Sequence, residues 1–335
     1  MRHLAAAICF SRTWGEASFA RKSGGKPPHS LIRWGANVNR RRFLKLAGAA
    51  VAGAAVAEAK QPQSSTYPAV LKAAEEAAEK ALPRQQPDGG LRDDYEIPLA
   101  MATAGFLGNL AAVYLAPESR FHRSRELLGR MERAGRHLCR VQHEDGTIDL
   151  PTTNFGSPPD TGFVLEPVCL AAALLRARKH PETRELEASL EAFIGRAAGA
   201  LATGGIHTPN HRWVVCAALA RCHSLFPDPR YVARIQQWLA EGMDQDGEGN
   251  FTERSTGIYN WVTDNALLTI GRLLRRPALF RLVRRNLEAM LYFRRPGGEM
   301  ATDISRRQDR FGRWTVRPYY RAYRFLGRHD RNGQF

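Results

Sequence analysis

The stretch Asp244-Gln245-Asp246-Gly247 separates two long apolar patterns, one over residues 229–243 and one over residues 259–274. Both patterns repeat apolar side chains at the i, i+3, i+4 spacing of one helical face. Acidic, amide and glycine residues in succession favour a turn over a continued helix. The stretch therefore predicts two helices joined by a polar break.

Similar breaks recur at His143-Glu144-Asp145-Gly146-Thr147, at Gly204-Gly205 and at Pro296-Gly297-Gly298-Glu299, with intervals of about 40 to 60 residues. Each interval has room for two helices. Helical hairpins stacked around a ring predict an all-α fold, an α/α toroid of the (α/α)6 type, complete or incomplete, whose loops at one end line a cleft. The alternative is an open superhelical solenoid that binds protein, which predicts closer similarity between the repeats.

The helical periodicity extends over most of the chain after residue 67, and no run of alternating apolar and polar residues predicts a strand. The helices that it predicts span residues 69–81, 95–116, 123–141, 165–179, 185–202, 211–225, 229–243, 259–274, 277–291 and 316–326.

The first 59 residues read as a twin-arginine export signal. Asn39-Arg40-Arg41-Arg42-Phe43-Leu44-Lys45 precedes an apolar run over residues 46–57 and the cleavage pattern Ala57-Glu58-Ala59. A run of about 12 residues is short of the roughly 20 that span a bilayer, so we expect no permanent membrane anchor. We expect a protein that is periplasmic or secreted, with residues 60–335 as one toroid domain.

The charge indicates the kind of partner. Of the net charge of +16, the first 59 residues supply ten Lys and Arg against two Asp and Glu, which leaves 39 against 31, or +8, for the rest. Export argues against a nucleic-acid partner, and no motif that combines aromatic with basic residues supports one. An acidic polysaccharide is the expected partner.

Four cysteines follow the signal, namely Cys139, Cys169, Cys216 and Cys222, and each lies in an apolar helical pattern. They read as buried packing residues, and a disulfide after export stays open. Cys216 and Cys222 with His223 match no zinc-site spacing, so the sequence predicts neither a metal nor a cofactor.

Three polar segments, residues 154–163, 207–213 and 253–260, hold the candidate functional residues, because function on a helical scaffold concentrates in loops. The alternative is structural: Asn210 as a helix cap, Glu253 with Arg254 as a surface pair, and Tyr259 as a core aromatic. The candidates for substrate binding are Asn154, Arg212, Trp213, Glu253, Arg254 and Asn260, and those for catalysis are Asn210, His211 and Tyr259.

The pair Asn210-His211 at a helix start, followed about fifty residues later by Tyr259 in the context Ser-Thr-Gly-Ile-Tyr-Asn, resembles the heparinase II/III and oligoalginate lyase group of polysaccharide lyases. The resemblance covers most of residues 65–335, and residues 230–310, with Ser305-Arg306-Arg307-Gln308-Asp309-Arg310, also look like heparinase II/III-like proteins of unassigned substrate. It implies cleavage of a uronate polymer by β-elimination.

These residue types suit that reaction. Removal of the C5 proton requires the charge of the C6 carboxylate to be neutralised, by a hydrogen bond from Asn210 and by His211 or Arg254. Tyr259 suits the acid that protonates the glycosidic oxygen, and in some lyases of this kind one tyrosine is also the base. A tyrosine base requires cations beside its phenol, for which Arg254 and Arg212 are candidates.

Lyases of this group continue into a β-sandwich that closes the cleft, whereas this sequence ends at Phe335. We therefore expect a fragment. The alternatives are that a second chain completes the site, or that the toroid binds sugar without cutting it.

Two other functions fit a toroid. One is a glycoside hydrolase, which uses two carboxylates, here from Asp160, Glu166, Asp246, Glu253 and Asp264. Hydrolysis leaves Asn210, His211 and Tyr259 without roles, so we rank it second. The other is a non-catalytic carbohydrate-binding protein.

The residues before Asn39 have no periodicity or caps and are unusual for a signal. We expect residues 1–37 not to be translated, with Val38 as a GTG start codon. N-terminal sequencing of the precursor should then find the first residue at position 38. A precursor that begins at Met1 would contradict this hypothesis.

Overall fold

The computed structural model describes residues 66–335 apart from residues 94 and 207. The twin-arginine segment, the start at Val38 and cleavage after Ala59 lie outside the described residues and stay predictions. The described chain is mostly helical, which confirms the all-α prediction.

The longer helices follow one another along the chain with short connections. They are α3 (Thr66–Ala81), α4 (Ala100–Leu115), α5 (Arg125–Val141), α6 (Pro158–Arg178), α7 (Arg184–Thr203), α8 (Pro209–Leu225), α9 (Pro229–Ala240), α10 (Tyr259–Leu273), α11 (Ala278–Tyr292) and α12 (Tyr320–His329). The described residues also form the 3-10 helices η1 (Leu82–Arg84), η2 (Pro181–Thr183) and η3 (Arg317–Tyr319) and an antiparallel pair of strands, β1 (Ile148–Leu150) and β2 (Asn154–Ser157).

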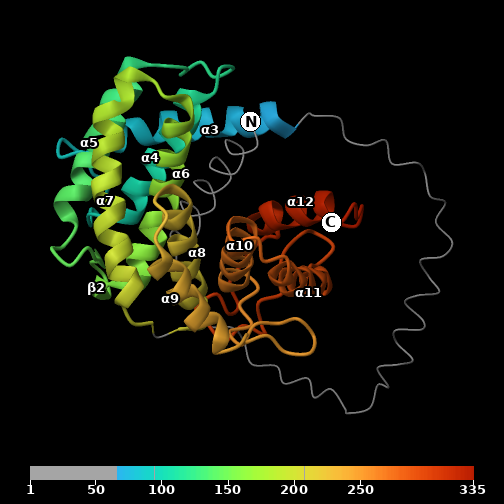
Figure 1. Cartoon of the computed structure of the whole chain (residues 1–335). Coiled ribbons are helices and arrows are strands. Elements are labelled where there is room, and N and C mark those ends of the chain that lie inside the picture. Colours follow the sequence, from blue (N-terminus) through green and yellow to red (C-terminus); the bar gives the residue numbers. More distant parts are fainter. Residues whose placement is uncertain (1–65, 94, 207) are drawn as a thin grey trace, which may run out of the picture.

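The helices alternate between two rows (Figure 1). The inner helices α4, α6, α8 and α10 pack on one another in succession, and α12 packs on α10. The outer helices α5, α7 and α9 also pack in succession, and each covers the inner helix before it, as α11 covers α10. Because each outer helix returns the chain, successive inner helices begin at the same end of the molecule. This two-row arrangement is that of an α/α toroid.

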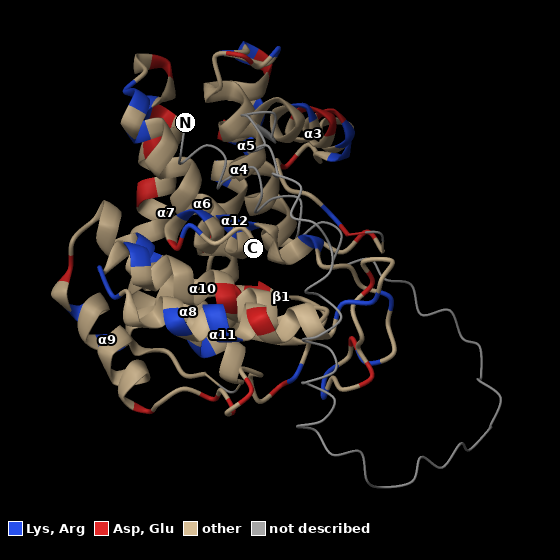
Figure 2. Cartoon of the chain, turned by 90° about the vertical axis from the view of Figure 1, so that its right-hand side faces the viewer, with Lys and Arg blue, Asp and Glu red and all other residues tan. Residues whose placement is uncertain are grey.

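The inner helices are buried on all sides. Residues 106–115 of α4, 159–172 of α6, 213–222 of α8 and 260–271 of α10 are buried without interruption. Figure 2 shows the contrast with α3, which carries charged residues along its exposed side, whereas α4 carries none. A helix that is apolar all round belongs in a core, so the one-faced pattern expected from the sequence holds for the outer row only. Among the described helices, none has the length and apolarity needed to cross a membrane.

The breaks repeat at the level of single hydrogen bonds. The side-chain Nε2 atoms of Gln85, Gln142 and Gln245 each donate to the carbonyl of the glycine four residues later and to a carbonyl of an outer helix, at 2.9–3.1 Å. These glutamines tie the breaks before α4, α6 and α10 to α5, α7 and α11, respectively. The predicted repeat is therefore real, and it includes an earlier break at residues 85–91.

Three glycines make this closure possible. Gly89, Gly146 and Gly249 have φ angles of 92°, 88° and 93°, in the left-handed region that favours glycine. A Cβ atom on any of them would lie 2.2–2.3 Å from the backbone carbonyl oxygen of an arginine in the outer helix. The break at Gly204-Gly205 lacks the glutamine and connects α7 to α8 differently.

Two predicted helix starts are wrong. α4 begins at Ala100 and not at residue 95, because Asp93 accepts hydrogen bonds from the backbone of Tyr95 and Ile97 and holds a turn there. α6 begins at Pro158 and not at residue 165, because proline is tolerated in the first turn and Ser157 caps the helix. The residues before Pro158 form the β1–β2 hairpin, which the sequence did not predict.

Substitution of Gly146 by alanine tests the closure. Gly146→Ala forces a side chain into the left-handed region and against a carbonyl, so we expect a loss of about 2 kcal/mol or more in the free energy of unfolding, measured with urea. The matched control is Gly195→Ala on α7, where no atom lies within 4 Å of the new Cβ. That change should stabilise the protein by up to about 1 kcal/mol. Equal effects of the two substitutions would contradict the proposed constraint.

Candidate active site

The polar segments before α6, α8, α10 and α12 lie at the end of the molecule where these helices begin, and we call them the rim (residues 142–157, 204–206, 208, 241–258 and 293–316). Contacts connect its parts: Thr256 Oγ1 donates to the carbonyl of Ala301 at 2.7 Å, and the backbone N–H of Gly257 donates to Asp309 at 2.9 Å. The loop between α11 and α12 is thereby held on the start of α10.

Asn210 and Glu253, predicted from separate segments, form the centre of the site. Asn210 Nδ2 donates to Glu253 Oε1 at 2.9 Å and to Oε2 at 2.8 Å, and both side chains are buried. The reading of Asn210 as a helix cap is wrong, because Thr208 occupies the cap position and Asn210 lies inside α8. The reading of Glu253 as a member of a surface pair is also wrong, because its side chain is buried.

Two arginines of the loop between α11 and α12 also contact Glu253. Arg307 Nε lies 3.4 Å from Glu253 Oε1, and the backbone N–H of Arg306 donates to the carbonyl of Glu253 at 3.1 Å. Burial raises the pKa of the Glu253 carboxyl, and the hydrogen bonds from Asn210 and the charge of Arg307 offset only part of this effect.

Tyr259 is the first residue of α10 and is half-buried, with its hydroxyl at the rim. Gln308 Nε2 donates to the hydroxyl of Tyr259. The guanidinium of Arg307 lies 4.9 Å from the centre of the Tyr259 ring, a cation–π contact. Arg307 therefore contacts both Glu253 and Tyr259. Because Tyr259 is only half-buried, the alternative reading of it as a core aromatic is wrong.

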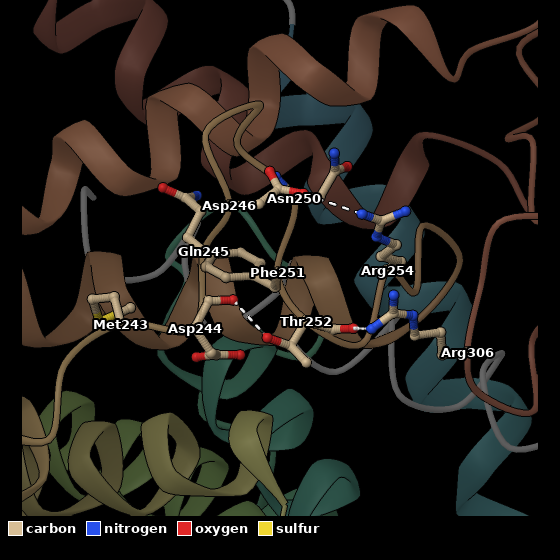
Figure 3. A pocket seen from close by; sticks show the side chains of 9 residues that line it. All are labelled: Met243, Asp244, Gln245, Asp246, Asn250, Phe251, Thr252, Arg254 and Arg306. Atoms are coloured by element: carbon tan, nitrogen blue, oxygen red, sulfur yellow. Dashed lines mark hydrogen bonds and ion pairs between the residues drawn. The ribbon is translucent and has the colours of Figure 1, made fainter.

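A pocket of about 320 Å³ opens in the segment before α10, and its lining includes Thr252 and Arg254, the sequence neighbours of Glu253 (Figure 3). Arg254 and Arg306 lie on one side of it, and Met243 and Gln245 lie on the other. Arg254 Nη2 pairs with Asp246 Oδ2 at 3.5 Å, and its φ of 48° is unusual for a residue with a side chain. The pocket thus offers two guanidinium groups, with the carboxylates of Asp244 and Asp246 also in its lining.

Three further predicted residues, His211, Asn154 and Arg212, have contacts to residues other than Glu253 and Tyr259. His211 is half-buried on α8, and its ring packs edge-to-face on Phe163 of α6 at 5.7 Å. Asn154, at the start of β2, donates to Asp160 Oδ2 at 3.0 Å. Arg212 pairs with Glu241 at 3.1 Å, so it does not provide the cation beside Tyr259.

Trp213 and Asn260 do not fit the substrate-contacting role predicted for them. Trp213 is fully buried, and its Nε1 donates to Asp244 Oδ1 at 3.2 Å. Asn260 is fully buried, and its Nδ2 lies 3.7 Å from Met290 Sδ. Both side chains therefore lie in the core.

No role was predicted for Arg306, Arg307 or Gln308, although their segment resembles heparinase II/III-like proteins. The charge distribution along the sequence could have pointed to them. Residues 272–335 hold 17 arginines, no lysine and five acidic residues, whereas residues 60–271 hold 22 basic and 26 acidic residues. The basic excess of the chain is therefore concentrated in the part that supplies the loop over Tyr259.

Within the part of the chain that the structure describes, no group of three His, Cys, Asp or Glu side chains forms a metal site. The four described cysteines are free thiols, and Cys169, Cys216 and Cys222 are buried, as predicted for packing residues.

No protein family matches the sequence, and no curated protein sequence does. Two of the solved structures that match this chain are lyases. A chondroitin AC lyase from Streptomyces coelicolor A3, in complex with chondroitin sulphate, matches with a TM-score of 0.55 and 18% identity over 73% of this chain. A chondroitinase AC lyase matches with a TM-score of 0.44 and 14% identity over 70% of this chain.

The first of these likenesses confirms the α/α toroid. This chain spans 35% of the length of the Streptomyces enzyme and 36% of the other. At such identities the likeness concerns the fold alone.

The raised pKa of Glu253 predicts a pH dependence. The Glu253 carboxyl binds its proton more tightly in the folded state than in the unfolded state. The protein therefore loses stability as the pH rises from the ordinary pKa of glutamate to the raised pKa of Glu253. Glu253→Gln removes this titration, and the new amide can donate to the buried Oδ1 of Asn210, which has no hydrogen-bond partner. We expect the free energy of unfolding to fall less between pH 4 and pH 8 in the variant than in the wild type.

The comparison of the two pH profiles isolates Glu253. Asp264 is fully buried, and burial raises the pKa of its carboxyl as well, so it contributes a slope of the same sign to both proteins. Parallel profiles for wild type and Glu253→Gln would show that Glu253 is not the group that titrates.

Proposed function

We propose that this chain is the toroid domain of a polysaccharide lyase that cleaves an acidic, uronate-containing polysaccharide by β-elimination. The observation that carries the proposal is the Tyr259 hydroxyl at the rim, bound by Gln308, beneath a guanidinium that also pairs with Glu253. The toroid fold shared with a chondroitin AC lyase supports it. Membership of the heparinase II/III-like group is part of the same proposal.

In this mechanism, arginines neutralise the substrate carboxylate. Arg254 and Arg306 line the pocket before α10, and Arg306 is exposed. A guanidinium donates two parallel hydrogen bonds to a carboxylate and offsets its charge, which lowers the cost of removing the neighbouring proton. His211 of α8 is a further candidate for contact with the substrate carboxylate.

Asn210 acts differently from the role expected from the sequence. Both of its amide donations go to Glu253, and its side chain is buried, so we propose that it positions Glu253 and does not bind the substrate carboxylate. Glu253 in turn holds Arg307 over Tyr259. The pair then determines where the phenol hydroxyl lies.

Tyr259 provides the proton transfer. Its hydroxyl accepts a hydrogen bond from Gln308 and keeps its own proton for donation to the glycosidic oxygen as the bond to C4 breaks. As a base, the same oxygen would take the C5 proton, and the cationic Arg307 would stabilise the phenolate.

The charge of the chain supports an acidic polymer as substrate. Arg294, Arg295, Arg306, Arg310 and Arg313 are exposed on the loop between α11 and α12, and this loop borders Tyr259. A polyanion laid across the rim meets these side chains on its way to the pocket. Export by the twin-arginine route, which we also propose, would bring the domain to such polymers.

Hydrolysis is less well supported by the positions of the carboxylates. Glu166 is buried and pairs with Arg221 at 2.7 Å, and Asp160 is buried and bonded to Ser157. Asp264 is fully buried in the middle of α10. These three lie in the core, where no water and sugar can approach them together.

Substitution of Tyr259 tests the proposed reaction. Tyr259→Phe removes only the hydroxyl, so we expect the rate of unsaturated uronate formation, followed by ultraviolet absorbance, to fall about 10²-fold or more while the polymer still binds. Alginate, heparan sulfate, hyaluronan, chondroitin sulfate and pectin are the substrates to compare. The matched control is Tyr292→Phe, because Tyr292 is 82% exposed at the end of α11.

The controls separate the alternatives. Tyr292→Phe should keep the full rate, and thermal unfolding of both variants checks that each is folded. An unchanged rate in Tyr259→Phe would overturn the assignment. New reducing ends without ultraviolet absorbance would indicate hydrolysis, and binding without either product would indicate a carbohydrate-binding protein.

A further inference from the structure

Two buried cysteines on neighbouring inner helices lie side by side. Cys169 on α6 and Cys222 on α8 have their sulfur atoms 3.8 Å apart, and the two side chains are 2% and 0% exposed. They lie 53 residues apart in the sequence, so the contact depends on the packing of α6 against α8.

We propose that Cys169 and Cys222 form a disulfide bond that joins these two inner helices. The sulfur atoms need to approach by only about 1.8 Å to reach the S–S distance of about 2.05 Å. Both cysteines lie in the buried stretches over which α6 and α8 pack directly on each other.

The other cysteines supply an internal contrast. Cys216 is also fully buried on α8, six residues before Cys222, but it has no sulfur neighbour among the described residues. Cys139 on α5 is half-buried, and its Sγ donates to the carbonyl of Ser189 at 3.3 Å. The geometry therefore selects one of the six possible pairings of the four thiols.

Formation of the bond requires an oxidant with access to both sulfurs. A thiolate attacks a disulfide oxidant such as glutathione disulfide, releases one glutathione thiol and forms a mixed disulfide. The second thiolate then displaces the other glutathione. Two protein thiols are oxidised, and one glutathione disulfide is reduced to two thiols.

The folded protein resists this attack. The hydrogen bond between the two thiols and their burial raise the pKa of Cys169, and neither sulfur is accessible. The bond therefore forms while the chain folds, or during opening of the α6–α8 contact. Once formed, a buried disulfide is shielded from reductants in the same way.

Refolding in a redox buffer tests the proposal. The full chain is unfolded with reductant, refolded in a mixture of reduced and oxidised glutathione, alkylated, denatured and digested for mass spectrometry. We expect a peptide pair linked through Cys169 and Cys222, a mass loss of about 2 Da, and alkylated Cys139 and Cys216. The linked protein should melt about 5 °C or more above the reduced protein.

Variants distinguish this pairing from others. Cys216→Ser should keep the linked peptide, and Cys169→Ala/Cys222→Ala should lose it together with the effect of reductant on the melting temperature. Should the double variant fail to fold, the peptide map of the wild type decides the question. Alkylation of both Cys169 and Cys222 in the refolded wild type, or a linkage through Cys139 or Cys216, would overturn the proposal.

Discussion

The side-chain amides of Gln85, Gln142 and Gln245 each hold a turn closed and fasten it to an outer helix. A buried amide that lacks its hydrogen bonds is costly, so each glutamine fixes the distance between the turn and the outer helix. The glycine four residues later permits the close approach, because any side chain would strike a backbone carbonyl. The starts of α4, α6 and α10 follow from this closure, and the turns before α6 and α10 form part of the rim.

The residues of the candidate site come from three parts of the chain. Asn210 comes from the start of α8, Glu253 and Tyr259 come from the start of α10, and Arg307 comes from the loop before α12. Deeper in the ring, Glu166 of α6 pairs with Arg221 of α8 at 2.7 Å and with Arg321 of α12 at 3.6 Å. A buried ion pair adds little net stability, but it specifies which helices are neighbours. The same geometry that orders the core thus aligns the residues at the rim.

Much of this architecture could be predicted from the sequence, because helix periodicity and polar breaks are local signals. The polar breaks predicted the toroid, and the polar composition of the segments around Asn210 and Tyr259 predicted that they hold the functional residues. Their meeting through the Asn210–Glu253 hydrogen bonds could not be predicted, because it depends on packing across 43 residues. Trp213 shows the opposite case, since its position near a helix start gave no indication that the side chain turns into the core. Arg307 was missed because its place over Tyr259 depends on the path of a long loop, which residue types alone do not specify.

The central claim is that the rim around Tyr259 breaks a uronate polymer by elimination. The most direct measurement is mass spectrometry of the products formed from a defined acidic oligosaccharide in water enriched with oxygen-18. Elimination adds no water, so the account predicts an unsaturated product about 18 Da lighter than the hydrolytic one and without the heavy isotope. Products that carry one oxygen-18 atom at the newly formed reducing end and no unsaturated sugar would contradict it.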